Sequence, residues 1–190
     1  MIKKLTFIWV CLLFAAHTSN AQTTLQYINK NVAYAQELMR ENRIPASVIL
    51  AVAIHESAAG TSKIARYLNN HFGVKGKNSS KKIKSSYKGY ESVQDSYDHF
   101  VGFIQDKSAF NKLFNQYQPD DYVGWAKGIQ RGGYAQSRTW SSQVIALIEK
   151  YELFKYDERP GQYLEAVIPK VKMPVKKSSK STKLLAENIK

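Results

Sequence analysis

Cysteine is nearly absent from this sequence. The 190 residues include one, Cys11, and only 15 acidic residues against 28 basic ones. Cys11 stands in an N-terminal apolar run that we expect to be removed, so the mature chain can form no disulfide, thiolate nucleophile or cysteine-ligated metal site. The shortage of acidic residues gives a formal net charge of +13, which favours polyanionic surroundings. Stability must then come from packing, and a hydrophobic fraction of 44% is typical of a globular domain.

Residues 1–21 predict a signal peptide. Lys3 and Lys4 precede an apolar stretch over residues 5–16, and a small-x-small cleavage site ends at Ala21. The stretch is too short to cross a hydrocarbon core of about 30 Å with ease. Loss of the two lysines lowers the formal charge from +13 to +11. We therefore expect an exported protein that is periplasmic, or extracellular and associated with the cell wall.

Apolar residues follow a helical spacing between residues 22 and 156, without a long period-2 alternation. This predicts a single, mainly α domain over residues 22–156. Helices are expected over residues 25–42, 46–57, 93–104, 122–129 and 137–150. Gly60 is expected to end the second of them. Residues 157–190, rich in proline, lysine and serine, predict a basic and loosely ordered tail.

One carboxylate stands where a purely structural helix would not need it. Glu56 follows a run of apolar and small residues and lies seven positions after Ile49, so it projects within roughly 20° of that side chain. An apolar face and a helix C-terminus both favour the protonated form of an acid. A protonated carboxyl can donate to a glycosidic oxygen as a general acid. The alternative is a solvated glutamate on the last helical turn.

Residues 57–90 contain no acidic side chain but eight lysines and arginines. Residues 75–88 within this stretch, and residues 170–183 of the tail, either contact an anionic wall or membrane surface or form solvated segments. Export argues against nucleic acid as the partner.

Neither a metal nor a cofactor is expected. His55 and Glu56 begin like a zinc-protease helix, but Ala59 stands where the second histidine of His-Glu-x-x-His is required. His71 and His99 have no ligand-like spacing, and we interpret them as structural residues.

Four short blocks carry a family signature. They are Ala53-Ile54-His55-Glu56-Ser57, Asn69-Asn70-His71-Phe72-Gly73-Val74-Lys75-Gly76, Tyr90-Glu91-Ser92 and Gly133-Tyr134-Ala135. In composition and order they resemble glycoside hydrolase family 73, the endo-β-N-acetylglucosaminidases that include the wall-cutting domain of flagellar rod-assembly proteins and many autolysins. The resemblance spans residues 26–156. It departs at Ala58 and Ala59, where many members carry glycine and tryptophan, so one sugar-stacking contact is in doubt.

The resemblance implies a mainly α, lysozyme-like α+β fold, with two lobes around a cleft and a small β-hairpin or loop lobe. It implies Glu56 as the catalytic acid. Tyr134 would lie beside Glu56 and hold the substrate's acetamido group or steady positive charge on the sugar ring. A second catalytic carboxylate is implied at Glu91 or Asp95, although each residue also suits an ordinary helix cap.

Substrate binding is implied for Asn70, Phe72, Gly73 and Lys75. Asn70, Phe72 and Gly73 would shape the floor of the cleft. For Phe72, packing in the core is favoured over stacking on a sugar.

The leading hypothesis is a monomeric peptidoglycan hydrolase without cofactor, which cuts glycan strands at the β-1,4 bond between N-acetylglucosamine and N-acetylmuramic acid. One alternative is a lytic transglycosylase or muramidase of related fold, which cuts the other bond. Another is a non-catalytic, basic wall-binding module. The blocks at residues 90–92 and 133–135 favour the glucosaminidase. Retaining, inverting and substrate-assisted mechanisms stay open, as do the physiological role and the role of the tail.

Overall fold

The computed structural model describes residues 23–158. The predicted signal peptide, residues 1–21, lies outside them, as does the predicted tail apart from residues 157 and 158. Across residues 23–158, no helix combines the length and the apolar character that a membrane span requires.

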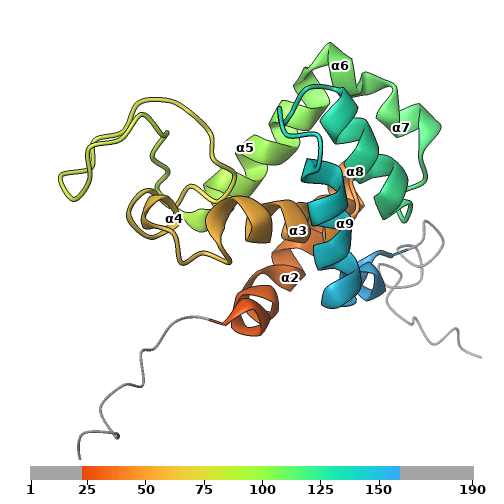
Figure 1. Ribbon diagram of the computed structural model, residues 1–190, viewed down its shortest axis with the longest axis horizontal. Helices are drawn as coiled ribbons and strands as arrows, with labels where there is room; N and C mark the ends of the chain where they lie inside the picture. The colour runs from red at the N-terminus through yellow and green to blue at the C-terminus, as the bar shows by residue number, and fades with distance from the viewer. Residues whose placement is uncertain (1–22, 159–190) are drawn as a thin grey trace, which may run out of the picture.

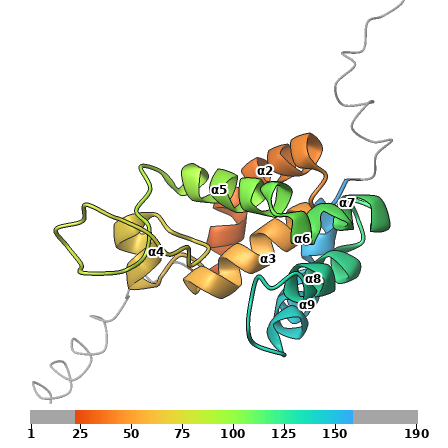
Figure 2. The ribbon, with the colours of Figure 1, turned by 90° about the horizontal axis from the view of Figure 1, so that it is seen from above.

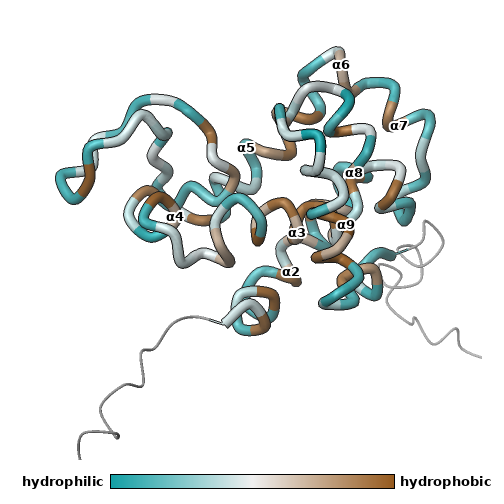
Figure 3. The backbone as a smooth tube through the Cα atoms, in the orientation of Figure 1, coloured by the Kyte–Doolittle hydropathy of each residue, from teal (hydrophilic) through white to brown (hydrophobic). Residues whose placement is uncertain are grey.

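The central element is α3 (Ala46–Ser57). Each of residues 46–54 is at most 5% exposed, because a helix that is apolar nearly all round must be covered on all sides. Helices α2 (Thr24–Asn42) and α5 (Val93–Asp106) lie on one side of it, and α8 (Tyr122–Arg131) and α9 (Trp140–Lys150) on the other (Figures 1 and 2). Figure 3 shows the hydrophobic residues gathered along α3 and on the helix faces turned toward it.

Short helical segments complete the fold. They are α4 (Lys63–Leu68), α6 (Ser108–Asn111), α7 (Leu113–Gln116) and the 3-10 turn η1 (Leu153–Tyr156). The segment η1 packs against α3 and α9. The predicted helices over residues 25–42, 46–57, 93–104 and 122–129 are therefore confirmed within two residues at each end.

One capping residue and one helix boundary differ from the predictions. Helix α3 ends at Ser57 as predicted, but Ala58 and not Gly60 ends it, because Ala58 already takes a left-handed conformation and its N–H bonds to the carbonyl of Ile54. Helix α9 starts at Trp140, so residues 137–139 form a turn in place of the first predicted helical turn.

Residues 74–90, which we call the loop lobe, project away from the helices beside α4 (Figures 1 and 2). The expected β-hairpin is reduced there to one isolated bridge between Lys75 and Tyr87. Of the two expected forms of this lobe, the structure takes the loop.

Three asparagine side chains hold the loop lobe together. Each Nδ2 group donates to two backbone carbonyls. Asn69 reaches the carbonyls of residues 90 and 91, Asn70 those of 74 and 88, and Asn78 those of 85 and 87, at distances of 2.8–3.1 Å. Three backbone bonds also cross the lobe, from Gly76 to Ser86, Lys88 to Val74 and Gly89 to Lys77, so the side-chain amides supplement a few backbone pairs.

Candidate active site

Glu56 lies half-buried on the last turn of α3 and is held from the other side of the domain. The indole Nε1 of Trp140, the first residue of α9, donates to Glu56 Oε1 at 2.8 Å. The edge of the His55 ring meets the same indole, with ring centroids 6.5 Å apart. The second oxygen, Glu56 Oε2, has no hydrogen-bond partner among the described residues. One carboxyl oxygen is therefore fixed and the other is available.

The floor beneath this carboxyl is Gly73. A β-carbon on Gly73 would stand 3.5 Å from Glu56 Oε2, so the backbone lies under the acid with no side chain between them. Gly73 has φ of +67°, a conformation that glycine adopts without steric cost.

Tyr134 forms a second wall of the site. It follows α8 and donates its hydroxyl to the backbone carbonyl of Phe72 at 3.2 Å. Its ring packs against Trp140, with centroids 5.2 Å apart. Burial raises the pKa of Tyr134 well above its usual range, and the nearby Glu56 and Tyr90 add to the shift. The phenol therefore keeps its proton beside Glu56.

Phe72 and Asn70 build the segment that carries Gly73. Phe72 is 3% exposed and stacks on Phe100 at 4.4 Å, so it lies in the core as favoured by the sequence. Asn70 is 1% exposed, and its Oδ1 accepts from the N–H of Val74 at 3.1 Å while its Nδ2 donates to two carbonyls. Neither side chain is open to a ligand, and both fix the backbone beneath Glu56.

Lys75 extends from this segment into the loop lobe. Its ammonium lies 3.4 Å from the centroid of the Tyr87 ring, which is close enough for a cation–π contact. The side chain is exposed. No contact of Lys75 with Glu56 or Tyr134 occurs in the described part of the chain.

The two candidates for a second carboxylate have different surroundings. Asp95 closes a capping box on α5, in which its Oδ2 accepts from the N–H of Ser92 at 2.9 Å and Ser92 Oγ accepts from the N–H of Asp95. Glu91 is exposed, and its carboxylate has no hydrogen bond or ion pair within residues 23–158. Asp95 thus has a structural task in the resting fold, and Glu91 has none.

Trp140 is the residue that the sequence did not single out. It was expected only as an apolar side chain of the last helix, and nothing local shows that an indole N–H would reach an acid 84 positions earlier. A tryptophan shortly after the block Gly133-Tyr134-Ala135 was the one available signal. Among residues 23–158, no group of three or more histidine, cysteine or acidic residues could hold a metal ion.

Two curated proteins are similar in sequence to this chain over about two thirds of its length. The exo-glucosaminidase LytG of Bacillus subtilis is 29% identical over 151 residues, which cover 70% of this chain and 53% of LytG. The peptidoglycan hydrolase FlgJ of Vibrio parahaemolyticus is 23% identical over 146 residues, covering 66% of this chain and 47% of that protein. The chain thus spans about half the length of these curated relatives.

Solved structures show the fold directly. The catalytic domain of the autolysin Auto from Listeria monocytogenes superimposes with a TM-score of 0.62 at 24% identity, over 76% of this chain and 93% of that domain. The glycoside hydrolase domain of FlgJ from Salmonella typhimurium gives a TM-score of 0.57 at 18% identity, over 76% of this chain and 96% of that domain. The predicted lysozyme-like, mainly α fold is confirmed.

The family itself follows from the sequence match. A family model described as mannosyl-glycoprotein endo-beta-N-acetylglucosaminidase matches residues 32–153, which is more than half of the chain and includes Glu56, Gly73, Tyr134 and Trp140. The chain therefore belongs to the glucosaminidase family of glycoside hydrolases.

Proposed function

We propose that this chain is a peptidoglycan hydrolase that cleaves the β-1,4 bond between N-acetylglucosamine and N-acetylmuramic acid, with Glu56 as the general acid. The family and the names of the relatives support the reaction class. The observation that carries the assignment of the acid is the asymmetry of the Glu56 carboxyl: Trp140 donates to Oε1, while Oε2, beside Gly73, has no hydrogen-bond partner among residues 23–158.

This asymmetry suits proton donation. An N–H donor at Oε1 leaves that oxygen as an acceptor, so the proton of the neutral carboxyl resides on Oε2. Oε2 is the oxygen without a protein partner. The proton therefore points to where a glycosidic oxygen can receive it as the bond to the sugar breaks.

Tyr134 is proposed to serve the substrate through its oxygen. Its own proton is donated to the carbonyl of Phe72, so a lone pair is what the phenol offers. A lone pair accepts the N–H of the acetamido group, or steadies the positive charge that develops on the sugar ring. Its raised pKa keeps the group neutral in either role.

The second catalytic group is proposed to be Glu91, because its carboxylate is unengaged while that of Asp95 caps α5. The competing route uses the substrate's own acetamido oxygen as the nucleophile. Replacement of Glu91 by Gln distinguishes the routes: a large loss of kcat supports activation of water by Glu91, and an unchanged kcat supports the acetamido route.

Asp95→Asn is the companion variant. The amide oxygen can still accept from the N–H of Ser92, but the negative charge at the start of α5 is lost, for which a stability loss of roughly 0.3–1 kcal/mol is expected. The variant leaves kcat unchanged if Asp95 is structural. A fall in kcat with unchanged stability would transfer the second role to Asp95.

A test of the main proposal is mass spectrometry of the fragments released from purified peptidoglycan and then reduced. Reduced N-acetylglucosamine ends are expected. Reduced N-acetylmuramic acid ends would indicate a muramidase, anhydro ends a lytic transglycosylase, and absence of fragments a wall-binding module. Oligosaccharide fragments would show endo cleavage, and release of disaccharides alone would show exo cleavage.

Glu56→Gln is expected to lower the rate at least about a hundredfold. The amide oxygen of glutamine still accepts from Trp140, so the melting temperature is expected to stay near that of the wild type. Glu37→Gln, an exposed change on α2, is the matched control. An active Glu56→Gln enzyme would remove Glu56 from the mechanism.

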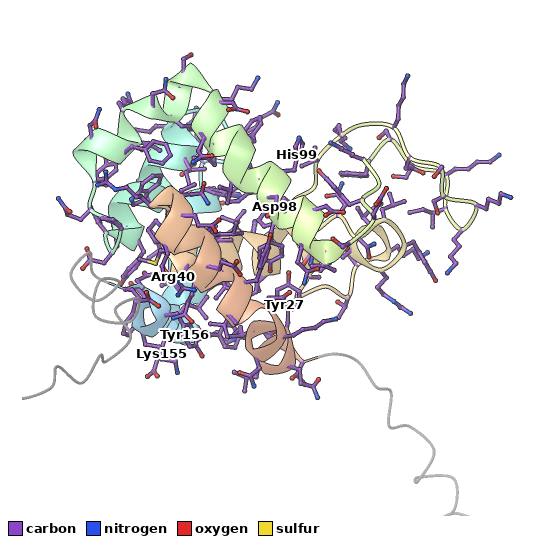
Figure 4. All side chains as sticks on the ribbon, turned by 180° about the vertical axis from the view of Figure 1, so that it is seen from behind. Tyr27, Arg40, Asp98, His99, Lys155 and Tyr156 are labelled. Atoms are coloured by element: carbon purple, nitrogen blue, oxygen red, sulfur yellow. The ribbon has the colours of Figure 1, made fainter. Side chains whose placement is uncertain are left out.

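We further propose that the protein is exported, acts as a monomer, and contacts an anionic wall or membrane surface through the loop lobe and the tail. A surface hollow of about 810 Å³ lies between α4 and the loop lobe, where Arg66, Tyr67 and three lysines line it. Figure 4 shows nitrogen-tipped side chains projecting from this lobe into solvent. A cluster of cations attracts polyanions, more strongly at low salt.

Sedimentation with purified walls tests this contact. Replacement of Lys77, Lys81 and Lys82 by glutamine is expected to weaken wall binding about tenfold at low salt. The same replacement at Lys112, Lys127 and Lys150, which are equally exposed but lie on the helices and their connections, is the charge-matched control. Equal losses in both variants would show that only net charge matters.

A further inference from the structure

A small cavity lies on the side of α3 away from Trp140. It has a volume of about 160 Å³ and lies between α2, α4 and the segment of residues 69–71. Tyr27, which lines it, stands on the α2 side of the molecule (Figure 4). Glu56 does not line this cavity. His71 does, and it is two residues before Gly73, so the same short segment forms the floor of the catalytic site and a wall of the cavity.

The cavity is positively charged. Lys30 and Arg66 both line it, and no acidic side chain of the described residues does so. Neither cation has a carboxylate partner within residues 23–158. Lys30 is close enough to His71 to depress the pKa of the imidazole. Two cations without a carboxylate partner thus border this cavity, and Arg66 also lies over the Tyr67 ring and borders the hollow beside the loop lobe.

A buried hydrogen-bond chain determines which atom His71 presents to this space. Tyr97 OH lies 2.8 Å from Tyr27 OH, and Tyr27 OH lies 2.6 Å from His71 Nδ1. Tyr27 is the only hydrogen-bond partner of Tyr97 OH in the described structure, so Tyr97 must donate to Tyr27 to use its proton. Tyr27 also contacts the Ser57 hydroxyl, whose own proton is donated to the carbonyl of Ala53. We assign the Tyr27 proton to His71 Nδ1, which lies 2.6 Å away.

The tautomer of His71 follows from this order. Burial, together with Lys30, lowers the pKa of His71 to about 4, so the ring is neutral and carries one proton. With Nδ1 acting as acceptor, that proton is on Nε2. Nε2 of His71 has no hydrogen-bond partner in residues 23–158. Every fully buried side-chain nitrogen or oxygen in these residues has such a partner, so Nε2 is not fully buried. His71 is only 5% exposed and lines the cavity, so its Nε2–H reaches that space.

A second neutral donor comes from Asn31. This residue is 6% exposed and lines the cavity. Its Nδ2 gives one hydrogen to the carbonyl of Tyr27 at 2.7 Å, and its other N–H has no partner among residues 23–158. The ring N–H of His71 and the amide N–H of Asn31 therefore line the same cavity as the cations Lys30 and Arg66.

We propose that this cavity is a binding site for a carboxylate group. Cations with neutral N–H donors are the surroundings in which carboxylates are held in proteins, and the volume suits a group of the size of acetate. Two sources are compatible with this chemistry: a small free carboxylate, or a carboxylate on the peptide stem of the glycan strand. The second source rests on the proposed function. A stem residue spans about 3.3–3.6 Å when extended. A stem of a few residues on a strand bound at Glu56 can therefore extend past residues 71–73 to the cavity.

Acetate is the first probe. Full-length protein with isotope-labelled histidine is titrated with sodium acetate, and the His71 ring resonances are followed by NMR. A saturable shift is expected, and acetamide, which is uncharged and of the same shape, is expected to give none. Lys30→Met and Arg66→Met should each weaken acetate binding about tenfold. Both side chains are exposed, so the fold should tolerate the changes.

Lys63→Met is the control, because Lys63 is an exposed lysine on α4 that does not line the cavity. It should bind acetate like the wild type. A wild-type protein without a saturable acetate response at His71 overturns the proposal, and so do equal losses in all three variants.

Soluble glycan strands with and without their peptide stems identify the source. Lys30→Met is the variant for this test, because Lys30 lines the cavity and not the hollow beside the loop lobe. If the stem occupies the cavity, Lys30→Met lowers kcat/KM on stem-bearing strands and leaves stripped strands unaffected. If Lys30→Met loses acetate binding but cleaves both strands normally, the ligand is a free carboxylate. Failure of the wild type to cleave either strand would refute the proposed function, while the acetate titration would still decide the cavity.

Discussion

Trp140 Nε1 donates to Glu56 Oε1 at 2.8 Å across 84 positions of sequence. This contact joins the end of α3 to the start of α9, and it is the one hydrogen bond that the Glu56 carboxyl receives from the described residues. The orientation of the proposed acid therefore depends on α9, the last α-helix among residues 23–158.

Replacement of Trp140 by phenylalanine tests this dependence. The ring remains but the N–H is lost, so the carboxyl becomes free to rotate. We expect kcat to fall about tenfold, which corresponds to the loss of one charge-assisted hydrogen bond, with little change in KM. Steady-state kinetics on solubilised glycan strands measure both parameters.

Trp125→Phe is the matched control, because Trp125 also makes one indole hydrogen bond, to the carbonyl of Gln118 at 3.0 Å, away from the site. It should lose stability but keep kcat. If both variants lose kcat in proportion to stability, the Trp140 contact is structural and does not orient the acid.

Tyr134→Phe removes one hydroxyl from the wall of the site. The variant loses the hydrogen bond to the Phe72 carbonyl, for which a stability loss of about 1 kcal/mol is expected. We expect kcat/KM to fall about tenfold or more, because the phenol oxygen no longer meets the substrate.

Tyr117→Phe is its control, since it deletes a hydroxyl that accepts from Arg131, the last residue of α8, and that has no contact with Glu56 among the described residues. An unchanged kcat/KM in Tyr134→Phe would limit this phenol to supporting the floor segment.

Asp157 predicts a pH dependence of stability. Burial raises its pKa from 3.8 to about 7, against two hydrogen bonds from Ser47 that lower it, and Asp120 adds to the rise. The folded state therefore binds this proton more tightly than the unfolded state. The contribution of Asp157 to the free energy of unfolding is full below pH 3.8 and is lost as the pH rises to about 7.

Asp157→Asn should remove this component, because an amide does not titrate and its oxygen can still accept from the N–H of Ser47. The measurement is thermal unfolding from pH 4 to pH 9. The difference in melting temperature between the variant and the wild type should grow in favour of Asn as the pH rises to about 7 and then level off. A difference that is constant over this range would contradict the assignment.

Gly60→Ala is expected to destabilise the protein. Gly60 has φ of +77°, and a β-carbon there would stand 2.9 Å from Tyr27 Cε2. The backbone term alone is about 1–2 kcal/mol, and displacement of the Tyr27 ring adds to it. Gly102→Ala is the control: it lies within α5 with no atom within 4 Å of the added carbon, and should stabilise by roughly 0.5–1 kcal/mol. Chemical denaturation measures both changes.

The helices were predictable because their signals are local. Helix α3 was predicted from residue 46 to residue 57 because it is apolar all round, and α2 because apolar residues recur at helical spacing. The end of α3 at Ser57 was also predicted, but Ala58 was missed as the capping residue, since an alanine in the left-handed region has no sequence signal comparable to glycine.

The site was predictable only in part. Glu56, Gly73 and Tyr134 were named from short blocks, and the structure brings them together. The indole of Trp140 and the chain from Tyr97 through Tyr27 to His71 join residues 44 to 84 positions apart. A single sequence carries no periodicity that reports such pairs.

The side-chain hydrogen bonds of the three asparagines in the loop lobe determine where the chain can tolerate an insertion. In a hairpin, an inserted residue shifts every later pair of the ladder. Here the asparagine contacts, and the backbone bonds from Gly76 to Ser86, Lys88 to Val74 and Gly89 to Lys77, join residues on either side of residues 79–84. An insertion within residues 79–84 therefore shifts none of these pairs. This tip is where a tag or a wall-targeting peptide can be inserted with the helical core and Glu56 left undisturbed.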